Sequence, residues 1–329
     1  MINEALCKCI AQRTADKNIL LIGARGNVGN RALRLLLHCG TASSITAFDK
    51  KPPPDTGLPA QVIIRTGPAG DITDFDAVRE ATAGKDTVVC AVGVPRRSPS
   101  GEKKPSPYDI EENGMENIVQ ASRRSGAGHI IYISVLGAAL GDGIPPFHHG
   151  CRAKRNAEQV LIGSGIAYTI IRPTGYFNDY REILYRAMAG TYRIVNDGSA
   201  RAQPIDEQNV AEMLIASIGN GRARNSIIAA GGPEAFTKKQ FADVFGRLLH
   251  ETVTPLSMTP EQYKKAVFNS DLLLFRALSD SVLSDAEMET LRRVYPEIRL
   301  RCLEDYLNSL NDPRLQDYFK NKEENNGQL

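Results

Sequence analysis

Three glycines, each separated from the next by two residues, form the first pattern in this chain that suggests chemistry. Gly23, Gly26 and Gly29 follow the apolar run 19–22, and an amphipathic stretch comes after them. Gly23 suits a tight turn, Gly26 lets backbone N–H groups approach a pyrophosphate, and Gly29 lets a helix pack close to a strand. The phosphates would lie at the helix N-terminus, where unpaired N–H groups and the positive end of the helix dipole meet. The predicted cofactor-binding residues of this turn are Gly23, Arg25, Gly26, Asn27, Val28 and Gly29.

An acidic residue strengthens this interpretation, because three glycines alone are a weak signal. Asp49 ends a second apolar run, SSITAFD, and stands twenty residues beyond Gly29. This is about where a carboxylate reaches the ribose hydroxyls of a dinucleotide. The alternative is a tight loop between two ordinary core elements. We expect a nucleotide site.

The same residues bear on the choice of cofactor. Asp49 would repel a 2′-phosphate and so favours NAD(H). Arg25 and Lys50 offer positive charges that would pair with that phosphate and favour NADP(H). The sequence favours NAD(H), with NADP(H) as the alternative.

Two further segments are expected to contact the cofactor. Asp71, in the segment 70–86, is placed near the adenine, with a turn or helix-cap role as the alternative. Ala91 and Gly93 end the expected strand 87–93, and their small size would let the cofactor lie against the backbone at the carboxyl edge of the sheet.

Strands and helices must alternate to position these residues. Further strands are expected at 61–65, 129–134, 167–173 and 225–232, and helices at 109–125, 151–162 and 209–219. This rhythm predicts an α/β fold with a doubly wound parallel sheet of the Rossmann type over residues 1–235. Capping-box patterns at Thr237, Thr259 and Ser284 predict a mainly helical C-terminal lobe over 236–329, expected to close over the substrate. The tail 320–329 is expected to be disordered.

Composition excludes several classes of partner. The 329 residues are 42% hydrophobic and 24% charged, with a net charge of +2, which gives no reason to expect nucleic acid. No apolar run long enough for a membrane span occurs, and the N-terminus lacks the apolar core of a signal peptide. A cytoplasmic monomer or homodimer is expected. The cysteines at 7, 9, 39, 90, 151 and 302 lack metal-ligand spacing, so reduced thiols and no metal are predicted.

One long loop, 94–107, is rich in proline, serine and glycine. It carries four basic residues, Arg96, Arg97, Lys103 and Lys104. A basic lid over an acidic substrate and a solvated charged loop are the two interpretations, and the second is favoured.

Several of these segments together resemble a known superfamily. The segments are GARGNVG, GDITD, ISVLGA, KRNAEQVLIGSGIAYTIIRPTGYFN, PIDEQNVAEMLIASI and AGGPEAFT. Over residues 17–240 the chain resembles the atypical short-chain dehydrogenase/reductases, and within them the NmrA-like NAD(P)-binding proteins. Isoflavone-reductase-type enzymes and divinyl chlorophyllide reductases look like more distant relatives.

The resemblance implies catalytic residues at the end of the fifth strand and on the helix after it. Ser134 would hydrogen-bond a substrate carbonyl or cap the strand end. Lys154 would bind the nicotinamide ribose and act in acid/base chemistry, whereas a solvated lysine paired with Glu158 is the alternative. The tyrosine that most of the wider family has four residues earlier is Gly150 here.

Two histidines precede Lys154 by about one turn. His148 or His149 would replace the missing tyrosine as proton donor, because imidazole titrates near neutral pH. Loop histidines without a role are the alternative.

By the same resemblance, the loop after the sixth strand lines the substrate pocket. Its residues are Thr174, Tyr176, Phe177 and Asn178. The aromatic pair suits an apolar or planar substrate, although core packing explains it equally well. These features predict an NAD(P)-dependent oxidoreductase acting on a small organic substrate. The alternatives are a non-catalytic NAD(P)-binding sensor with a protein partner, and a cofactor-dependent isomerase, dehydratase or cyclase.

Overall fold

A computed structural model describes residues 3–54, 58–59, 61–94 and 105–326 of the chain. Four basic residues of the loop 94–107, Arg96, Arg97, Lys103 and Lys104, therefore lie outside the described residues. The chain forms two compact units built from interleaved segments. The first unit comprises Met1–Pro173, Glu207–Ala230 and Ser284–Arg299, and the second Thr174–Asp206, Gly231–Leu283 and Leu300–Leu329. A division into two domains after residue 235 stays a prediction.

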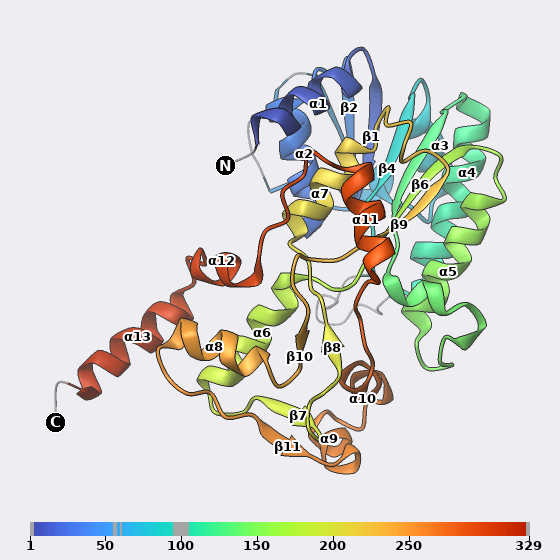
Figure 1. Ribbon diagram of the computed structural model, residues 1–329. Helices are drawn as coiled ribbons and strands as arrows, with labels where there is room; N and C mark the ends of the chain where they lie inside the picture. The colour runs from blue at the N-terminus through green and yellow to red at the C-terminus, as the bar shows by residue number, and fades with distance from the viewer. Residues whose placement is uncertain (1–2, 55–57, 60, 95–104, 327–329) are drawn as a thin grey trace. The chain divides into compact units, whose positions relative to one another are not determined.

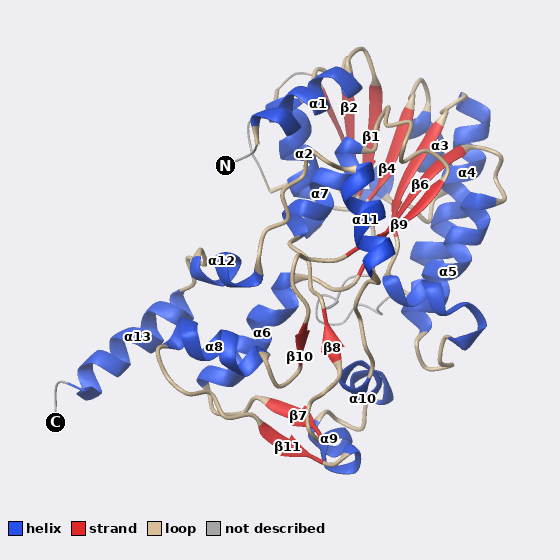
Figure 2. Cartoon of the chain, in the orientation of Figure 1, coloured by secondary structure: helices blue, strands red, loops and turns tan. Residues whose placement is uncertain are grey.

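The first unit contains a seven-stranded parallel sheet, which confirms the Rossmann-type fold (Figures 1 and 2). Its strand order is β3-β2-β1-β4-β5-β6-β9. The strands are β1 (Asn18–Ile22), β2 (Ser44–Phe48), β3 (Val62–Arg65), β4 (Thr87–Cys90), β5 (His129–Ile133), β6 (Ala167–Pro173) and β9 (Ser226–Ala230). Ile22 is in register with Phe48 and Cys90, so the central strands end together. The loops that follow them therefore meet at one edge of the sheet.

Helices cover both faces of this sheet (Figure 1). One layer contains α1 (Glu4–Thr14), α2 (Asn27–Cys39), α7 (Glu207–Ala216) and α11 (Asp285–Val294), and the other α3 (Phe75–Thr82), α4 (Gly114–Ser125) and α5 (His149–Ile162). The short helices are η1 (Gly67–Gly70), η2 (Tyr108–Asn113) and η3 (Leu136–Gly143). The expected helix 109–125 is divided, because η2 is a π-helix that leads into α4. π-Helical turns often occur at functional sites.

A disulfide overturns the expectation that all six cysteines are reduced. Cys7 on α1 is bonded to Cys39 at the end of α2, at a sequence separation of 32. The two helices pack against each other, and this packing brings the sulfur atoms together. The other four cysteines, Cys9, Cys90, Cys151 and Cys302, form no disulfide among the described residues.

The second unit is mainly helical and also contains short strands. Its helices are α6 (Phe177–Met188), α8 (Phe241–Leu249), α9 (Pro260–Ala266), α10 (Asp271–Leu278), α12 (Leu303–Asn308) and α13 (Pro313–Asn326). Two two-stranded sheets pair β8 (Arg201–Ala202) with β10 (Phe236–Thr237), and β7 (Arg193–Val195) with β11 (Leu256–Met258). Its apolar core gathers aromatic side chains, and Tyr180, Phe241 and Phe245 are all at least nine-tenths buried.

Two of the three predicted capping boxes begin helices, and the described part of the expected disordered tail is helical. At the starts of α9 and α11, the hydroxyls of Thr259 and Ser284 accept the backbone N–H of the N3 residue, and the N3 side chain accepts the backbone N–H of the N-cap. Thr237 exchanges the same pair of bonds with Gln240. Helix α13 continues through the expected disordered segment as far as Asn326. Its first turns are held to the second unit by Leu315, Tyr318 and Phe319, which pack on the aromatic core.

Candidate active site

The glycine turn lies between β1 and α2 and packs against the end of β4. Gly23 has a φ of +81°, and a Cβ there would lie 2.8 Å from the carbonyl carbon of Ala91. A Cβ on Gly29 would lie 2.0 Å from the carbonyl oxygen of Gly23. Both positions therefore require glycine, which explains two of the three residues on steric grounds.

The third glycine leaves the start of α2 open. Gly26 is the N-cap of this 13-residue helix, and no side chain caps its backbone N–H groups. Such an end attracts an anion such as a pyrophosphate. The Asn27 amide donates to Glu207 at 3.1 Å, and Val28 is buried in the core. These two side chains support the turn, and its backbone N–H groups are the part of it that would meet a pyrophosphate.

Asp49 joins the end of β2 to the glycine turn. One carboxylate oxygen accepts the backbone N–H of Arg25 at 3.1 Å, and the other accepts that of Lys51 at 3.4 Å. The guanidinium of Arg25 reaches the carbonyl oxygen of Pro52 at 3.3 Å. The carboxylate is therefore fixed where a ribose would approach.

Lys50 and Asp71 form an ion pair of 2.8 Å. Asp71 also accepts hydrogen bonds from the backbone and the hydroxyl of Thr73. Burial alone would raise the pKa of Asp71, but the Lys50 and Thr73 hydrogen bonds hold it below its ordinary value. Both side chains are thus engaged with each other at the start of the segment 70–86.

A buried ion pair stands beside the end of β4, and sequence reasoning missed its acidic member. Lys154 on α5 donates to Glu111 on η2 at 2.9 Å, to the carbonyl oxygen of Ile133 at 2.9 Å and to the hydroxyl of Tyr132 at 3.5 Å. Glu111 is 3% exposed. A Cβ on Gly93 would lie 3.8 Å from the other oxygen of this carboxylate, so Glu111 faces the strand edge where Ala91 and Gly93 lie.

This network fixes the position of the Lys154 side chain. An ammonium has three N–H bonds, and each of them has an acceptor here. The expected alternative, in which Lys154 pairs with Glu158, is wrong, because Glu158 holds Arg172 through two hydrogen bonds. Burial, helped by the charge of Glu111, raises the pKa of Tyr132 far above its ordinary value, so this phenol stays protonated and donates to Glu111.

A signal for Glu111 is present in the sequence. The residue falls four and seven positions before Met115 and Ile118, on the buried face of the helix. A carboxylate on an apolar helical stripe needs a partner, because an unpaired buried charge is very costly.

Ser134 follows β5 at the same edge of the sheet. It is 3% exposed, and its backbone N–H donates to Ile171 at 2.8 Å. Within the described part of the chain, its hydroxyl has no hydrogen-bond partner. A buried hydroxyl of this kind is suited to a bound substrate or cofactor.

The two histidines separate into different environments. His148 is the N-cap of α5, where its Nδ1 accepts the backbone N–H of Cys151 at 3.3 Å and its Nε2 lies 3.2 Å from the Cys151 sulfur. His149 is exposed, and its Nδ1 lies 3.3 Å from the hydroxyl of Tyr108. His148 therefore contacts the first turn of its own helix, whereas His149 contacts the phenol of Tyr108.

The four expected substrate residues belong to the second unit. The Thr174 hydroxyl donates to the carbonyl oxygen of Gln203, and Tyr176 forms a β-bridge with Ile205. Phe177 is 1% exposed and packs against Tyr306 with ring centroids 5.2 Å apart, which matches the core-packing alternative. Asn178 is half-buried on the first turn of α6. A substrate role for this loop stays a prediction.

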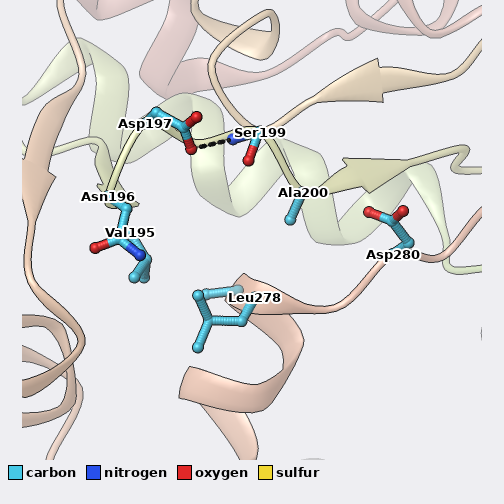
Figure 3. A pocket seen from close by; sticks show the side chains of 8 residues that line it. Val195, Asn196, Asp197, Ser199, Ala200, Leu278 and Asp280 are labelled. Atoms are coloured by element: carbon cyan, nitrogen blue, oxygen red, sulfur yellow. Dashed lines mark hydrogen bonds between the residues drawn. The ribbon is translucent and has the colours of Figure 1, made fainter.

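A hollow of about 480 Å³ lies elsewhere in the second unit (Figure 3). It is lined by Val195, Asn196, Asp197, Ser199, Ala200, Ala277, Leu278 and Asp280. Asp197 accepts the backbone N–H of Ser199 at 3.0 Å. None of the four expected substrate residues lines this hollow.

Metal and membrane features can be assessed for the described residues. Cys7, His38 and Cys39 bring their ligand atoms within 4.8 Å of one another, but the two sulfur atoms are joined as a disulfide and are not thiolates. Within the same residues, no helix combines the length and the apolar character needed to cross a bilayer.

Comparison with known proteins agrees with the geometry of the first unit. A family model described as NAD(P)H-binding matches residues 23–220. The chain is 24% identical over 259 residues to the chloroplastic divinyl chlorophyllide a 8-vinyl-reductase of Cucumis sativus, covering 73% of this chain and 58% of that protein. It is 23% identical to quinone oxidoreductase 2 of Escherichia coli, covering 76% of this chain and 80% of the relative.

A solved structure supports the fold assignment. The Escherichia coli NADPH-dependent quinone oxidoreductase, determined with NADPH, matches with a TM-score of 0.71 at 20% identity. The match covers 89% of this chain and all of the other.

Proposed function

We propose that this chain, which belongs to the NAD(P)H-binding family, is an NAD(P)-dependent oxidoreductase acting on a small, planar and largely apolar organic substrate. The observations that carry the proposal are the Lys154 ammonium, which donates to the Ile133 carbonyl, and the buried hydroxyl of the next residue, Ser134, which has no hydrogen-bond partner among the described residues. Ser134 directly follows β5, and Lys154 contacts Ile133, the last residue of that strand. This end of β5 lies at the sheet edge that also carries the glycine turn.

The residues present fit a dinucleotide. Gly23 and Gly29 have no room for a side chain, and the open N-terminus of α2 is suited to the pyrophosphate. Lys154 would exchange its long 3.5 Å contact with the Tyr132 hydroxyl for a hydroxyl of the nicotinamide ribose, and Ser134 would donate to a substrate oxygen. When bound, the nicotinamide supplies or accepts the hydride.

The sequence contains two opposed signals for the choice of cofactor, and the contacts favour NAD(H). Asp49 is held in place by two backbone N–H groups at the end of β2. Lys50, one of the two cations that would attract a 2′-phosphate, is already paired with Asp71. In this proposal, the repulsion of a 2′-phosphate by Asp49 therefore outweighs the attraction of that phosphate to the guanidinium of Arg25.

Relatives guide the choice of test substrates. The names of two relatives specify a quinone and the vinyl group of a chlorophyllide. A quinone is a planar conjugated ring, and the vinyl group is attached to a planar conjugated macrocycle. We therefore propose a conjugated carbonyl compound as substrate, with quinones as the first probes.

The experiment is a titration of purified protein with NADH and NADPH by nicotinamide fluorescence, followed by turnover with a quinone series. G29A should weaken binding at least about tenfold, because the new Cβ would meet the carbonyl oxygen of Gly23. G128A is the matched control, since a Cβ there has no neighbour within 4 Å among the described residues. Absence of binding to either dinucleotide would overturn the proposal. Binding without turnover of any quinone would favour the sensor alternative.

A further inference from the structure

Reduction of a conjugated carbonyl compound needs a proton as well as a hydride, and the structure restricts which side chains can deliver it. Lys154 directs its three N–H bonds to acceptors inside the protein. Tyr132 is fully buried and donates to Glu111. His148 contacts Cys151 through both ring nitrogens. These three side chains are committed to holding the site together.

A second pair of titratable side chains lies at the beginnings of the same two helices. Tyr108 is the first residue of η2, and His149 is the first residue of α5. The phenolic oxygen lies 3.3 Å from Nδ1 of the imidazole, and the rings meet edge-on with centroids 6.1 Å apart. Tyr108 is half-buried and His149 is exposed, so both can exchange protons with water or a ligand.

The Tyr108–His149 pair lies on the interface between η2 and α5, here called the seam, which also holds Lys154. Helices η2 and α5 pack against each other, and Glu111 with Lys154 and Glu112 with Asn156 bridge them. Tyr108 is about one turn before Glu111, toward the start of the seam. Because η2 follows β4 and α5 follows β5, the first residues of both helices lie toward the carboxyl edge of the parallel sheet.

Space is available next to the pair. A Cβ on Gly150, the neighbour of His149, would have no described heavy atom within 4 Å. An oxygen of a small substrate can therefore approach this end of α5 without displacing a side chain of its first turn.

We propose that Tyr108 is the proton donor of the reductase, and that His149 orients its hydroxyl and restores its proton. The proposal rests on the reductase function proposed above. The substrate class is a quinone or a conjugated ketone, whose oxygen takes the proton.

The proton balance is simple. As the substrate accepts a hydride with its two electrons, the O–H bond of Tyr108 breaks and a new O–H bond forms on the substrate oxygen. The phenolate then takes the Nδ1 proton of His149 while Nε2 of the exposed ring takes a proton from solvent, so that the imidazole stays neutral. One hydride and one proton are consumed for each quinone reduced to a hydroquinone.

The test compares Y108F and H149A with wild type in NADH-dependent reduction of menadione. Y108F should lower kcat about 100-fold, the usual contribution of a general acid, while the Kd for NADH changes less than about twofold. H149A should lose activity that added imidazole restores, and imidazole should not restore Y108F. Y168F is the matched control, because Tyr168 lies near the amino end of β6 in the same unit.

A measurement without cofactor follows the pair itself. In ¹⁵N spectra of histidine-labelled protein, Y108F should move the Nδ1 signal of His149, whereas Y168F should not. Wild-type protein that reduces no quinone would overturn the reductase function. Active wild type with an equally active Y108F, or an unmoved His149 signal, would overturn the role of Tyr108 alone.

Discussion

The ammonium of Lys154 lies 2.9 Å from the carboxylate of Glu111, and this ion pair joins α5 to η2 beneath the carboxyl edge of the sheet. The lysine is 17% exposed and the glutamate 3% exposed in their side chains. Because little water reaches the pair, each charge depends on the other. The same carboxylate oxygen also accepts the hydroxyl of Tyr132, which links the pair to β5.

Replacing the carboxylate with an amide tests this dependence. E111Q keeps the shape but leaves a buried ammonium without its counter-charge, so the free energy of unfolding should fall by about 3 kcal/mol. The misplaced ammonium should also lower kcat about tenfold or more. Urea unfolding and quinone reduction measure the two effects. E112Q is the control, because Glu112 accepts only from the neutral amide of Asn156. Equal loss in both variants would contradict a special role for Glu111.

Cofactor preference should depend on the charge of Asp49. D49N keeps an oxygen that can accept the N–H of Arg25 but removes the repulsion of a 2′-phosphate. The ratio of the Kd for NADPH to the Kd for NADH should fall about tenfold, equivalent to about 1.4 kcal/mol. Fluorescence titration of both dinucleotides gives this ratio. D74N, which alters the N-cap of α3, should leave it unchanged. A constant ratio in D49N would mean that the carboxylate does not meet the ribose.

The sequence predicts the sheet and the glycine turn well because both depend on local patterns. The run 19–22 is apolar throughout, as a strand buried on both faces must be, and the glycines follow it directly. Strand β6 was expected over the same residues that form it, 167–173. By contrast, β8 and β10 have two residues each, too few to show a period.

The partners within the site could not be predicted, because they come from different elements. Glu111 meets Lys154 across 43 positions of sequence, and Tyr108 meets His149 across 41. Sequence spacing within one helix instead suggested Glu158 for Lys154. That residue is turned to the sheet, where Arg172 on β6 needs a counter-charge. Which of two carboxylates pairs with Lys154 is therefore decided by how the helices pack on the sheet.

Buried His129 should make the protein sensitive to acid. Burial, with the charge of Arg224, lowers the pKa of His129 from 6.5 to about 4. In the unfolded chain this histidine therefore binds a proton near pH 6.5, whereas in the folded protein it binds one only near pH 4. The free energy of unfolding therefore falls as the pH decreases from 6.5 to 4. The loss should reach about 3 kcal/mol at pH 4, at about 1.4 kcal/mol for each tenfold change in the equilibrium.

The contribution of this histidine is isolated by a variant that cannot titrate. H129Q retains an N–H donor for Thr169, the partner of the ring at 3.0 Å, and should flatten the stability curve between pH 7 and pH 4. H38Q, at an exposed position, should follow the wild-type curve. Parallel curves for H129Q and wild type, obtained by urea unfolding at each pH, would show that His129 is not the acid-sensitive group.

The disulfide between Cys7 and Cys39 should stabilise the first unit by fastening α1 to α2. Closing a loop of this length, 32 residues in sequence, restricts the unfolded chain and is worth about 3–4 kcal/mol. C7S should therefore lower the free energy of unfolding by about this amount under non-reducing conditions. A dithiol reductant should lower wild type to the same value and leave C7S unchanged. C302S is the control, since Cys302 is free and half-buried, and it should remain as sensitive to the reductant as wild type. Wild type that is indifferent to the reductant, with its thiols shown by alkylation to be reduced, would rule out a stabilising cross-link and leave α1 held by the packing of Leu6 and Ile10 and by the hydrogen bonds of Arg13.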